Sequence, residues 1–464
     1  MNSAISAGTR GTRTSAATTV SDAAFRRELW GWSAVAIGSL AIAGVFAALL
    51  AVSRIPGIET VFPWPLEFFR KGLVIHVVFS FVVWFLAVFG ALLQLATREA
   101  AGDTVRFAWL GRLSVIGMFT AFPLLFIPAL LDRGEPTLNN YVPVIIDPLY
   151  YAGLAVMAIA MTLTVARLLL NRPALSSGAP LAGPVAGAGL IFLTAMACFG
   201  LAFGELTGQA PSFTFNEELF WGGGHILQFL NTLLMLVGWS LLATSAAGRP
   251  VPGSAVMWTA TALLALSALA GPVFYFVFEP FLADQTLAFT NLQYALAVPS
   301  LIVALGAIMW IRRPVPWASP AFLCLVLSMA VFGIGGILGL FVDGADTRTP
   351  AHYHGVIAGV TLVFMGLFYE VFLPLLKRPL VRGKAVYVQI YLFACGQLAA
   401  CIGLFLAGGF GAPRKTAGDA QGLDEFGAIT GMTLNGVGAL FAVVGGVMFI
   451  WMVARALLRA PETV

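Results

Sequence analysis

Twelve long apolar runs are the feature that most limits how this 464-residue chain can fold. A helix needs about 20 mainly apolar residues to cross a bilayer, and each run is that long. Charged residues make up only 10% of the chain, whereas a soluble domain carries about 25%. We therefore predict an all-α integral membrane protein, built as a twelve-transmembrane-helix bundle. The predicted spans are 31–53, 72–96, 107–131, 148–171, 184–206, 217–245, 255–279, 287–311, 318–342, 351–376, 386–410 and 428–456.

The basic residues are distributed unevenly between the two sides of such a bundle. If successive loops alternate, 18 of the 25 Lys and Arg residues fall on the side that holds both termini, and the remaining 7 fall on the other side. The positive-inside rule then predicts a multi-pass protein of the bacterial inner membrane with both termini in the cytoplasm. Residues 1–28 begin with a Ser-, Thr-, Ala- and Gly-rich stretch and are predicted to be a disordered cytoplasmic tail, which leaves 29–464 as the membrane domain.

Charge and cysteine usage exclude several other classes of function. The net charge of +4 is too small and too dispersed to indicate binding to nucleic acid. All four cysteines lie in apolar runs without a CxxC spacing. The sequence therefore predicts no disulfide framework, no zinc site and no covalently attached haem.

The four histidines of the chain, His76, His225, His352 and His354, all lie near the outer ends of spans 2, 6 and 10. Ionisable side chains within a span are costly and usually mark a functional site. Each imidazole could simply bond a neighbouring helix, but their shared depth favours ligands of haem iron. His352 and His354 are about 200° apart on a helix of 3.6 residues per turn. They can bind two irons on opposite faces, so span 10 is predicted to separate two haems.

Three segments resemble catalytic subunit I of the haem–copper oxidase superfamily, most closely its b-haem cytochrome c oxidase and nitric oxide reductase branches. Residues 346–354, Asp-Thr-Arg-Thr-Pro-Ala-His-Tyr-His, are similar to the segment that opens helix 10 in this family. Residues 221–225, Trp-Gly-Gly-Gly-His, are similar to its helix-6 segment, and residues 270–274 align with its helix-7 motif. The resemblance in span number covers nearly the whole chain.

The resemblance implies a role for each histidine. A low-spin haem would lie between His76 and His354, and a high-spin haem would be bound by His352. His225 would face the high-spin haem as a ligand of a second metal, so His225 and His352 are the predicted catalytic pair. The resemblance also implies b-type haems, O2 or NO as the substrate, and an electron donor at the periplasmic side. That donor would be cytochrome c, quinol or a partner subunit.

The helix-7 segment departs from the family, whose Ala-Gly-Pro-His-His reads Ala-Gly-Pro-Val273-Phe274 here. Neither side chain has a lone pair, and His225 alone is a poor donor set for copper. We therefore expect two haems without a normal copper centre, and His225 as a hydrogen-bond donor to a ligand on the open iron. The active-site tyrosine of the family has no clear counterpart, since Phe229 occupies one usual place and Tyr275 is only a candidate substitute.

The predicted function is a dihaem membrane oxidoreductase that passes electrons from the low-spin to the high-spin haem. A conventional terminal oxidase, a nitric oxide reductase subunit, a haem-based gas sensor and a secondary transporter remain alternatives. Two acidic features are also open to two readings. Glu218 could be an acidic ligand or a proton relay, or Glu217 and Glu218 could together stabilise a helix N-terminus. Glu370 is either a proton-path residue or an ion-pair partner of Lys377.

Overall fold

The structure is a computed structural model that describes residues 10–53, 66–102, 104–171, 180–249, 251–309, 316–342, 344–380, 383–416 and 418–462. Within these ranges, 12 helical stretches are long and apolar enough to cross a membrane. This confirms the predicted all-α bundle. Apart from the first span, which covers Ala23–Leu50, every span begins and ends within five residues of its predicted bounds.

Several spans are interrupted, so the helices outnumber the spans. Spans 1 to 6 consist of α1 (Arg10–Ser53), α2 (Leu66–Val77) with η2 (Val78–Val83) and α3 (Trp84–Ala101), α4 (Ala108–Leu130), α5 (Pro148–Leu170), α6 (Ala182–Glu205) and α7 (Phe213–Ala247). Spans 7 to 9 consist of α8 (Ser254–Ala268) with α9 (Ala270–Val277), α10 (Ala283–Leu292) with η3 (Gln293–Leu296) and α11 (Ala297–Ile308), and α12 (Pro320–Leu338) with η4 (Gly339–Phe341). Spans 10 to 12 consist of α13 (Arg348–Leu367) with η5 (Phe368–Phe372) and α14 (Leu373–Leu375), α15 (Lys384–Gly409) and, after η6 (Gly418–Gln421), α16 (Phe426–Leu458).

The first helix begins earlier than the sequence predicts. Residues 1–9 of the predicted tail lie outside the described residues, but α1 starts at Arg10. Glu28 is only 6% exposed and pairs with Arg167 of α5, with 2.5 Å between Oε2 and Nη1. The tail boundary predicted at residue 28 is therefore too late. Hydropathy does not include the residues around Glu28 in the first span, because a charged side chain lowers the mean hydropathy even when a buried partner neutralises it.

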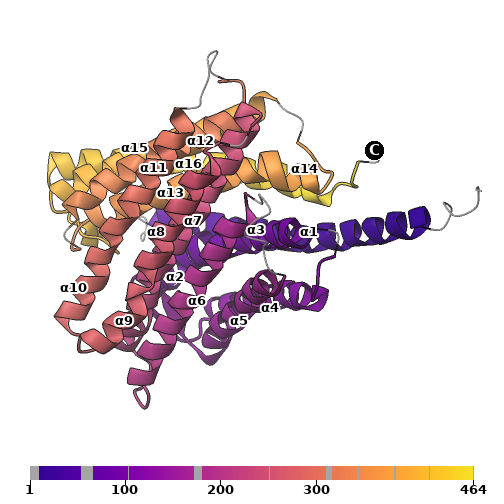
Figure 1. The fold of residues 1–464 in the computed structure, drawn as a ribbon. Helices are drawn as coiled ribbons and strands as arrows, with labels where there is room; N and C mark the ends of the chain where they lie inside the picture. The colour runs from indigo at the N-terminus through magenta and orange to yellow at the C-terminus, as the bar shows by residue number, and fades with distance from the viewer. Residues whose placement is uncertain are drawn as a thin grey trace, which may run out of the picture.

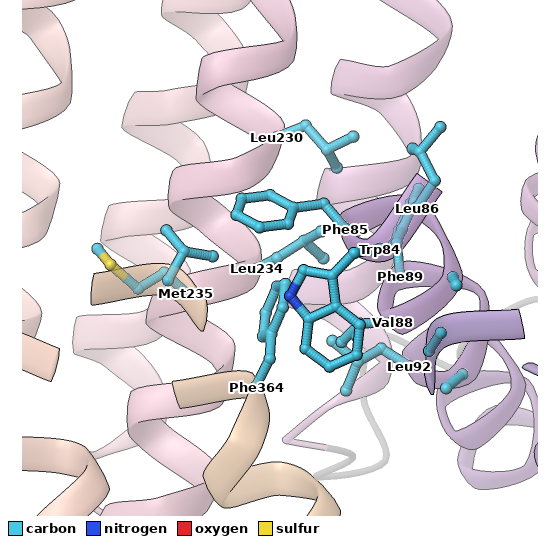
Figure 2. Packing of buried hydrophobic residues seen from close by; sticks show 14 of the residues in the cluster. Trp84, Phe85, Leu86, Val88, Phe89, Leu92, Leu230, Leu234, Met235 and Phe364 are labelled. Atoms are coloured by element: carbon cyan, nitrogen blue, oxygen red, sulfur yellow. The ribbon is translucent and has the colours of Figure 1, made fainter. Parts of the chain in front are cut away.

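The histidine-bearing spans form the centre of the bundle. In spans 2, 6 and 10, 78% of the most apolar window is buried, against 22–33% in spans 7, 8 and 12. Trp84 of α3 stacks on Phe368 at 5.6 Å between ring centroids and contacts Phe364 of α13 edge-on. Figure 2 shows Trp84 and Phe364 in this core, together with Leu230 and Leu234 of α7. The core thus fixes span 2 against spans 6 and 10.

The two ends of the bundle differ in character. The start of α1 and the end of α16 lie at one end of the bundle (Figure 1), where Trp30 Nε1 of α1 donates to the carbonyl oxygen of Leu457 at 3.0 Å. We call this the terminal end and the opposite one the histidine end. The histidine end carries an antiparallel hairpin of β1 (Glu135–Thr137) and β2 (Val144–Ile146), in which Glu135 pairs with Ile146 and Thr137 with Val144. We call residues 135–146 the cap hairpin.

Candidate functional site

Three of the four imidazoles share one hydrogen-bonding arrangement. Nδ1 lies 3.0 Å from the carbonyl oxygen of Ala43 in His76, 2.7 Å from that of Trp221 in His225, and 2.8 Å from that of Gly335 in His352. A carbonyl oxygen only accepts, so Nδ1 carries the proton in each ring. In the neutral ring Nε2 then keeps its lone pair, which is the state that a metal ligand needs.

His352 is held in a slot on α12. Its Nδ1 donates to Gly335, and a Cβ on Gly339 would lie 2.6 Å from that same nitrogen. Within the slot, α12 and α13 approach so closely that a Cβ on Gly335 would lie 2.7 Å from the carbonyl carbon of Gly355. The absence of side chains at these glycines therefore sets the position of the imidazole.

His76 and His354 lie on the same half of two neighbouring spans. His76 is eight residues before Trp84 and His354 is ten residues before Phe364, and these two aromatic rings are in contact. At 1.5 Å per residue, the histidines lie about 12 and about 15 Å from that contact, toward the histidine end. The π-helix η2 begins at Val78, two residues after His76. The imidazole of His354 stacks on Tyr353 at 5.2 Å.

His225 is surrounded by aromatic rings. Its ring centroid lies 4.5 Å from that of Tyr141, 4.6 Å from Trp221 and 5.9 Å from Phe289 of α10. In the neutral ring its Nε2 accepts a hydrogen bond rather than donating one. The bond from Nδ1 to Trp221 uses the only N–H of the neutral ring, so the donor role predicted for His225 would require a protonated imidazole.

In α9, Tyr275 contacts α7, whereas the sequence comparison places Val273 and Phe274 at the positions of the metal ligands. Val273, which replaces one of the family's ligand histidines, is 51% exposed. Phe274 packs on Phe289 at 5.1 Å, and the Tyr275 hydroxyl lies against Gly222, one turn before His225. The boundary between α8 and α9 lies at Leu269, whose backbone is still right-handed helical.

The described residues contain no group of three His, Cys, Asp or Glu side chains that could hold a metal ion. The donor set around His225 therefore does not fit copper, which in such sites takes several nitrogen or sulfur ligands. The donor set of His76, His352 and His354 fits haem iron, because each iron needs only one or two imidazoles. The side with His76, His352 and His354 thus fits haem iron, whereas the side with His225 does not fit copper.

The cap hairpin supplies a wall that sequence reasoning missed. Tyr141 has a left-handed backbone with φ of 64°, and its ring presses on Gly224, where an added Cβ would lie 2.6 Å from the tyrosine Cβ. The hairpin is bound from two sides. The Glu217 carboxylate accepts from Asn140 N at 2.8 Å and from Asn140 Nδ2 at 2.6 Å, and Lys415 Nζ donates to the carbonyl oxygen of Leu138. Glu217 therefore binds the hairpin, while α7 is capped by the Ser212 hydroxyl.

Burial changes the proton affinity of two groups in this cap. Loss of solvent raises the pKa of the Tyr141 phenol, and the nearby Glu217 carboxylate raises it further. Loss of solvent lowers the pKa of Lys415 from 10.5 to about 8; Arg414 adds to the effect and Glu217 opposes it. Tyr141 is therefore a neutral hydroxyl at physiological pH.

Glu370 lies far from the histidines, in the π-helix η5 at the terminal end. It accepts a hydrogen bond from Ser245 Oγ at 3.3 Å and lines a pocket with its neighbour Tyr369. Within the described residues Lys377 forms no ion pair, so the predicted pairing with Glu370 is wrong. The lengths of the two side chains permit the contact, but the left-handed backbone at Lys377, with φ of 58°, turns the chain at that point.

The comparison with known proteins agrees with this geometry. The family model of cytochrome c and quinol oxidase polypeptide I matches residues 30–448. An uncharacterized protein of Rickettsia prowazekii is 22% identical over 92% of this chain and 95% of its own length. Cytochrome c oxidase subunit 1 of Thermus thermophilus is 27% identical over 60% of this chain and 54% of its own length.

The fold is also similar to that of a solved structure. A cryo-EM structure of a heme-copper terminal oxidase dimer superimposes with a TM-score of 0.77, over 95% of this chain and 85% of that chain, at 15% identity. This likeness concerns the fold alone, whereas the family match extends along the sequence. The chain therefore belongs to the cytochrome c and quinol oxidase polypeptide I family and is a multi-pass membrane protein with the fold of the haem–copper oxidases.

Proposed function

We propose that this protein is a dihaem oxidoreductase of the bacterial inner membrane without a normal copper centre. His76 and His354 would hold a low-spin haem, and His352 would hold a high-spin haem with an open position. The observation that carries the proposal is the shared hydrogen bond from Nδ1 to a backbone carbonyl, which leaves Nε2 of His76 and His352 ready to bind iron. Bound haem would supply one-electron transfer and a site for O2 or NO.

The protein side chains would set the direction and the environment of this chemistry. His76, His352 and His354 lie toward one end of the bundle, so electrons would enter there, from cytochrome c, quinol or a partner subunit. By the distribution of basic residues, this histidine end would be periplasmic and both termini cytoplasmic. We expect b-type haems, as in the branches that the sequence resembles.

His225 would act as a hydrogen-bond acceptor beside the open position. Its Nδ1 is committed to Trp221, and its Nε2 would have to take up a proton before it could donate one. Tyr141, Trp221 and Phe289 exclude water around this ring. The proposed roles of His225 and His352 therefore differ: His352 binds iron, and His225 positions a ligand.

A gas sensor is the second candidate, and the aromatic surroundings of His225 favour it. Reduction of O2 needs several electrons at one place, and aromatic rings fill the space where a second metal would store some of them. A terminal oxidase or nitric oxide reductase with an ordinary metal centre would need ligands that the described residues lack. Membership of the oxidase family gives no support to the transporter alternative.

Visible spectra of the purified protein and of single alanine variants test the proposal. His76→Ala and His354→Ala should each abolish the low-spin signal, His352→Ala should remove the high-spin signal, and His225→Ala should keep both haems. Intact low-spin absorption in both His76→Ala and His354→Ala would contradict the assignment. Consumption of O2 or NO by the wild type separates an enzyme from a sensor.

A further inference from the structure

Two exposed arginines, Arg27 of α1 and Arg112 of α4, lie near the terminal end of these neighbouring helices; we call the surface along this helix pair the α1–α4 groove. These helices run side by side (Figure 1), and a Cβ on Gly31 of α1 would lie 2.6 Å from a methyl group of Val115 of α4. Arg27 precedes Gly31 by four residues, and Arg112 precedes Val115 by three. Since both helices start at the terminal end, these offsets of about one turn bring the two exposed arginines to one level.

Two carboxylates at the terminal end, those of Glu28 and Glu99, are bonded to other groups. Glu28 is buried against Arg167, which also bonds Gln94 Oε1 at 2.9 Å. Glu99 accepts hydrogen bonds from the backbone N–H of Ala182, at 2.6 Å, and of its preceding residue at the start of α6. Neither Arg27 nor Arg112 forms an ion pair with any other described residue. Their positive charges are therefore not compensated by the protein in this part of the structure.

An apolar ridge on α4 runs from the same level toward the middle of the bundle. Trp109 is 57% exposed, Ile116 is 60% exposed and Phe119 is 45% exposed. Ile116 and Phe119 follow Arg112 by four and seven residues, so they share its face of the helix. A tryptophan beside an arginine at the end of a span is typical of the level of lipid headgroups.

We propose that this α1–α4 groove, formed by Arg27, Trp109, Arg112, Ile116 and Phe119, binds an anionic phospholipid. The guanidinium groups would bond the phosphate, for which their planar fork is well suited. One acyl chain would lie along Ile116 and Phe119. The ridge favours a lipid over free phosphate, because an inorganic ion would leave these apolar side chains uncovered. The inference does not depend on the proposed haem chemistry.

Lipid binding by the full chain in detergent tests the proposal, with phosphatidylglycerol and phosphatidylcholine as probes and native mass spectrometry as the readout. The wild type should bind phosphatidylglycerol more tightly. The double variant Arg27→Gln/Arg112→Gln should bind it about tenfold more weakly, because each basic group near an anionic headgroup contributes to the affinity. The control Lys384→Gln, at an exposed basic residue of the same end, should not change it.

Three outcomes would overturn the inference. The first is equal affinity for phosphatidylglycerol in the double variant and in the Lys384 control. The second is equal affinity of the wild type for the two lipids. The third is displacement of the lipid by millimolar inorganic phosphate, which would show a site for free phosphate. If the double variant does not fold, as judged by circular dichroism, Arg112→Gln and the charge-preserving Arg112→Lys provide the comparison. Arg112→Gln should lose affinity, and Arg112→Lys, which keeps the charge but not the planar fork, should lose less.

Discussion

Two helix contacts at the histidine end use glycine in opposite ways. Between α12 and α13, Gly335 and Gly355 let the backbones touch, and the imidazole of His352 occupies the slot beside them. Around α7, the glycines at 222–224 admit rings from other elements, including Tyr141 and Tyr275. The first contact preserves a ligand in a fixed orientation. The second fills the corresponding space with aromatic packing, which supports the proposed absence of a normal copper centre.

The largest effect is expected where aromatic packing closes the site. Tyr141→Ala should lower the stability of the cap hairpin by about 3 kcal/mol, because it removes a ring packed against both His225 and Gly224. Hydrogen exchange of residues 135–146 measures the effect. Tyr141→Phe is the control and should behave as wild type, since the hydroxyl makes no hydrogen bond within the described residues. Equal exchange in both variants would show that the ring does not hold the hairpin.

The α12–α13 contact is tested by adding a side chain at a glycine, whereas Tyr141→Ala removes one. Gly335→Ala should cost about 2 kcal/mol of unfolding free energy, because its Cβ would lie 2.6 Å from the backbone nitrogen of Val356. Gly336 is the matched control, since a Cβ there meets nothing within 4 Å. Gly336→Ala should be neutral or slightly stabilising, as alanine is the better helix former. Thermal unfolding in detergent should separate the two variants, and coinciding midpoints would refute the close contact.

A smaller effect is expected from the polar attachment of the cap hairpin. Glu217→Gln should weaken it by about 1 kcal/mol, because charge-assisted bonds to Asn140 become ordinary ones. Glu218→Gln is the control, one residue along the same helix. Exchange of Asn140 and Tyr141 amides should speed up in the first variant only; a matching increase in the second would assign the effect to helix charge.

A further effect concerns pH and Lys415. The pKa of Lys415 is about 8 when the cap hairpin is packed in place and 10.5 when the side chain is free in solvent. Between pH 8 and 10.5 the state with the hairpin detached therefore binds more protons. The packed state gains stability as the pH rises over this range, and its stability does not depend on this group below pH 8. Amide exchange of the cap hairpin, corrected for its intrinsic pH dependence, should slow over that range. Lys415→Met should remove the dependence, and its persistence in that variant would point to another group.

The spans and the haem-ligand candidates could be predicted because both depend on local sequence. Hydropathy over about 20 residues identifies a span, and the spacing of His352 and His354 fixes their opposite directions on any helix. The cap hairpin could not be predicted, since Leu138 and Lys415 are 277 positions apart and their bond depends on the complete fold. The exposure of Val273 and the contact of Tyr275 with Gly222 likewise have no clear signal in the sequence, because they depend on packing between spans.

The central claim is that the haem side of this site is intact and the second-metal side is not. Metal and haem analysis of the purified full-length protein tests it most directly, with copper supplied during expression. We expect two haems per chain and copper well below one per chain, with the same haem content in His225→Ala. One tightly bound copper per chain, lost in His225→Ala, would contradict the account and restore an ordinary terminal-oxidase centre.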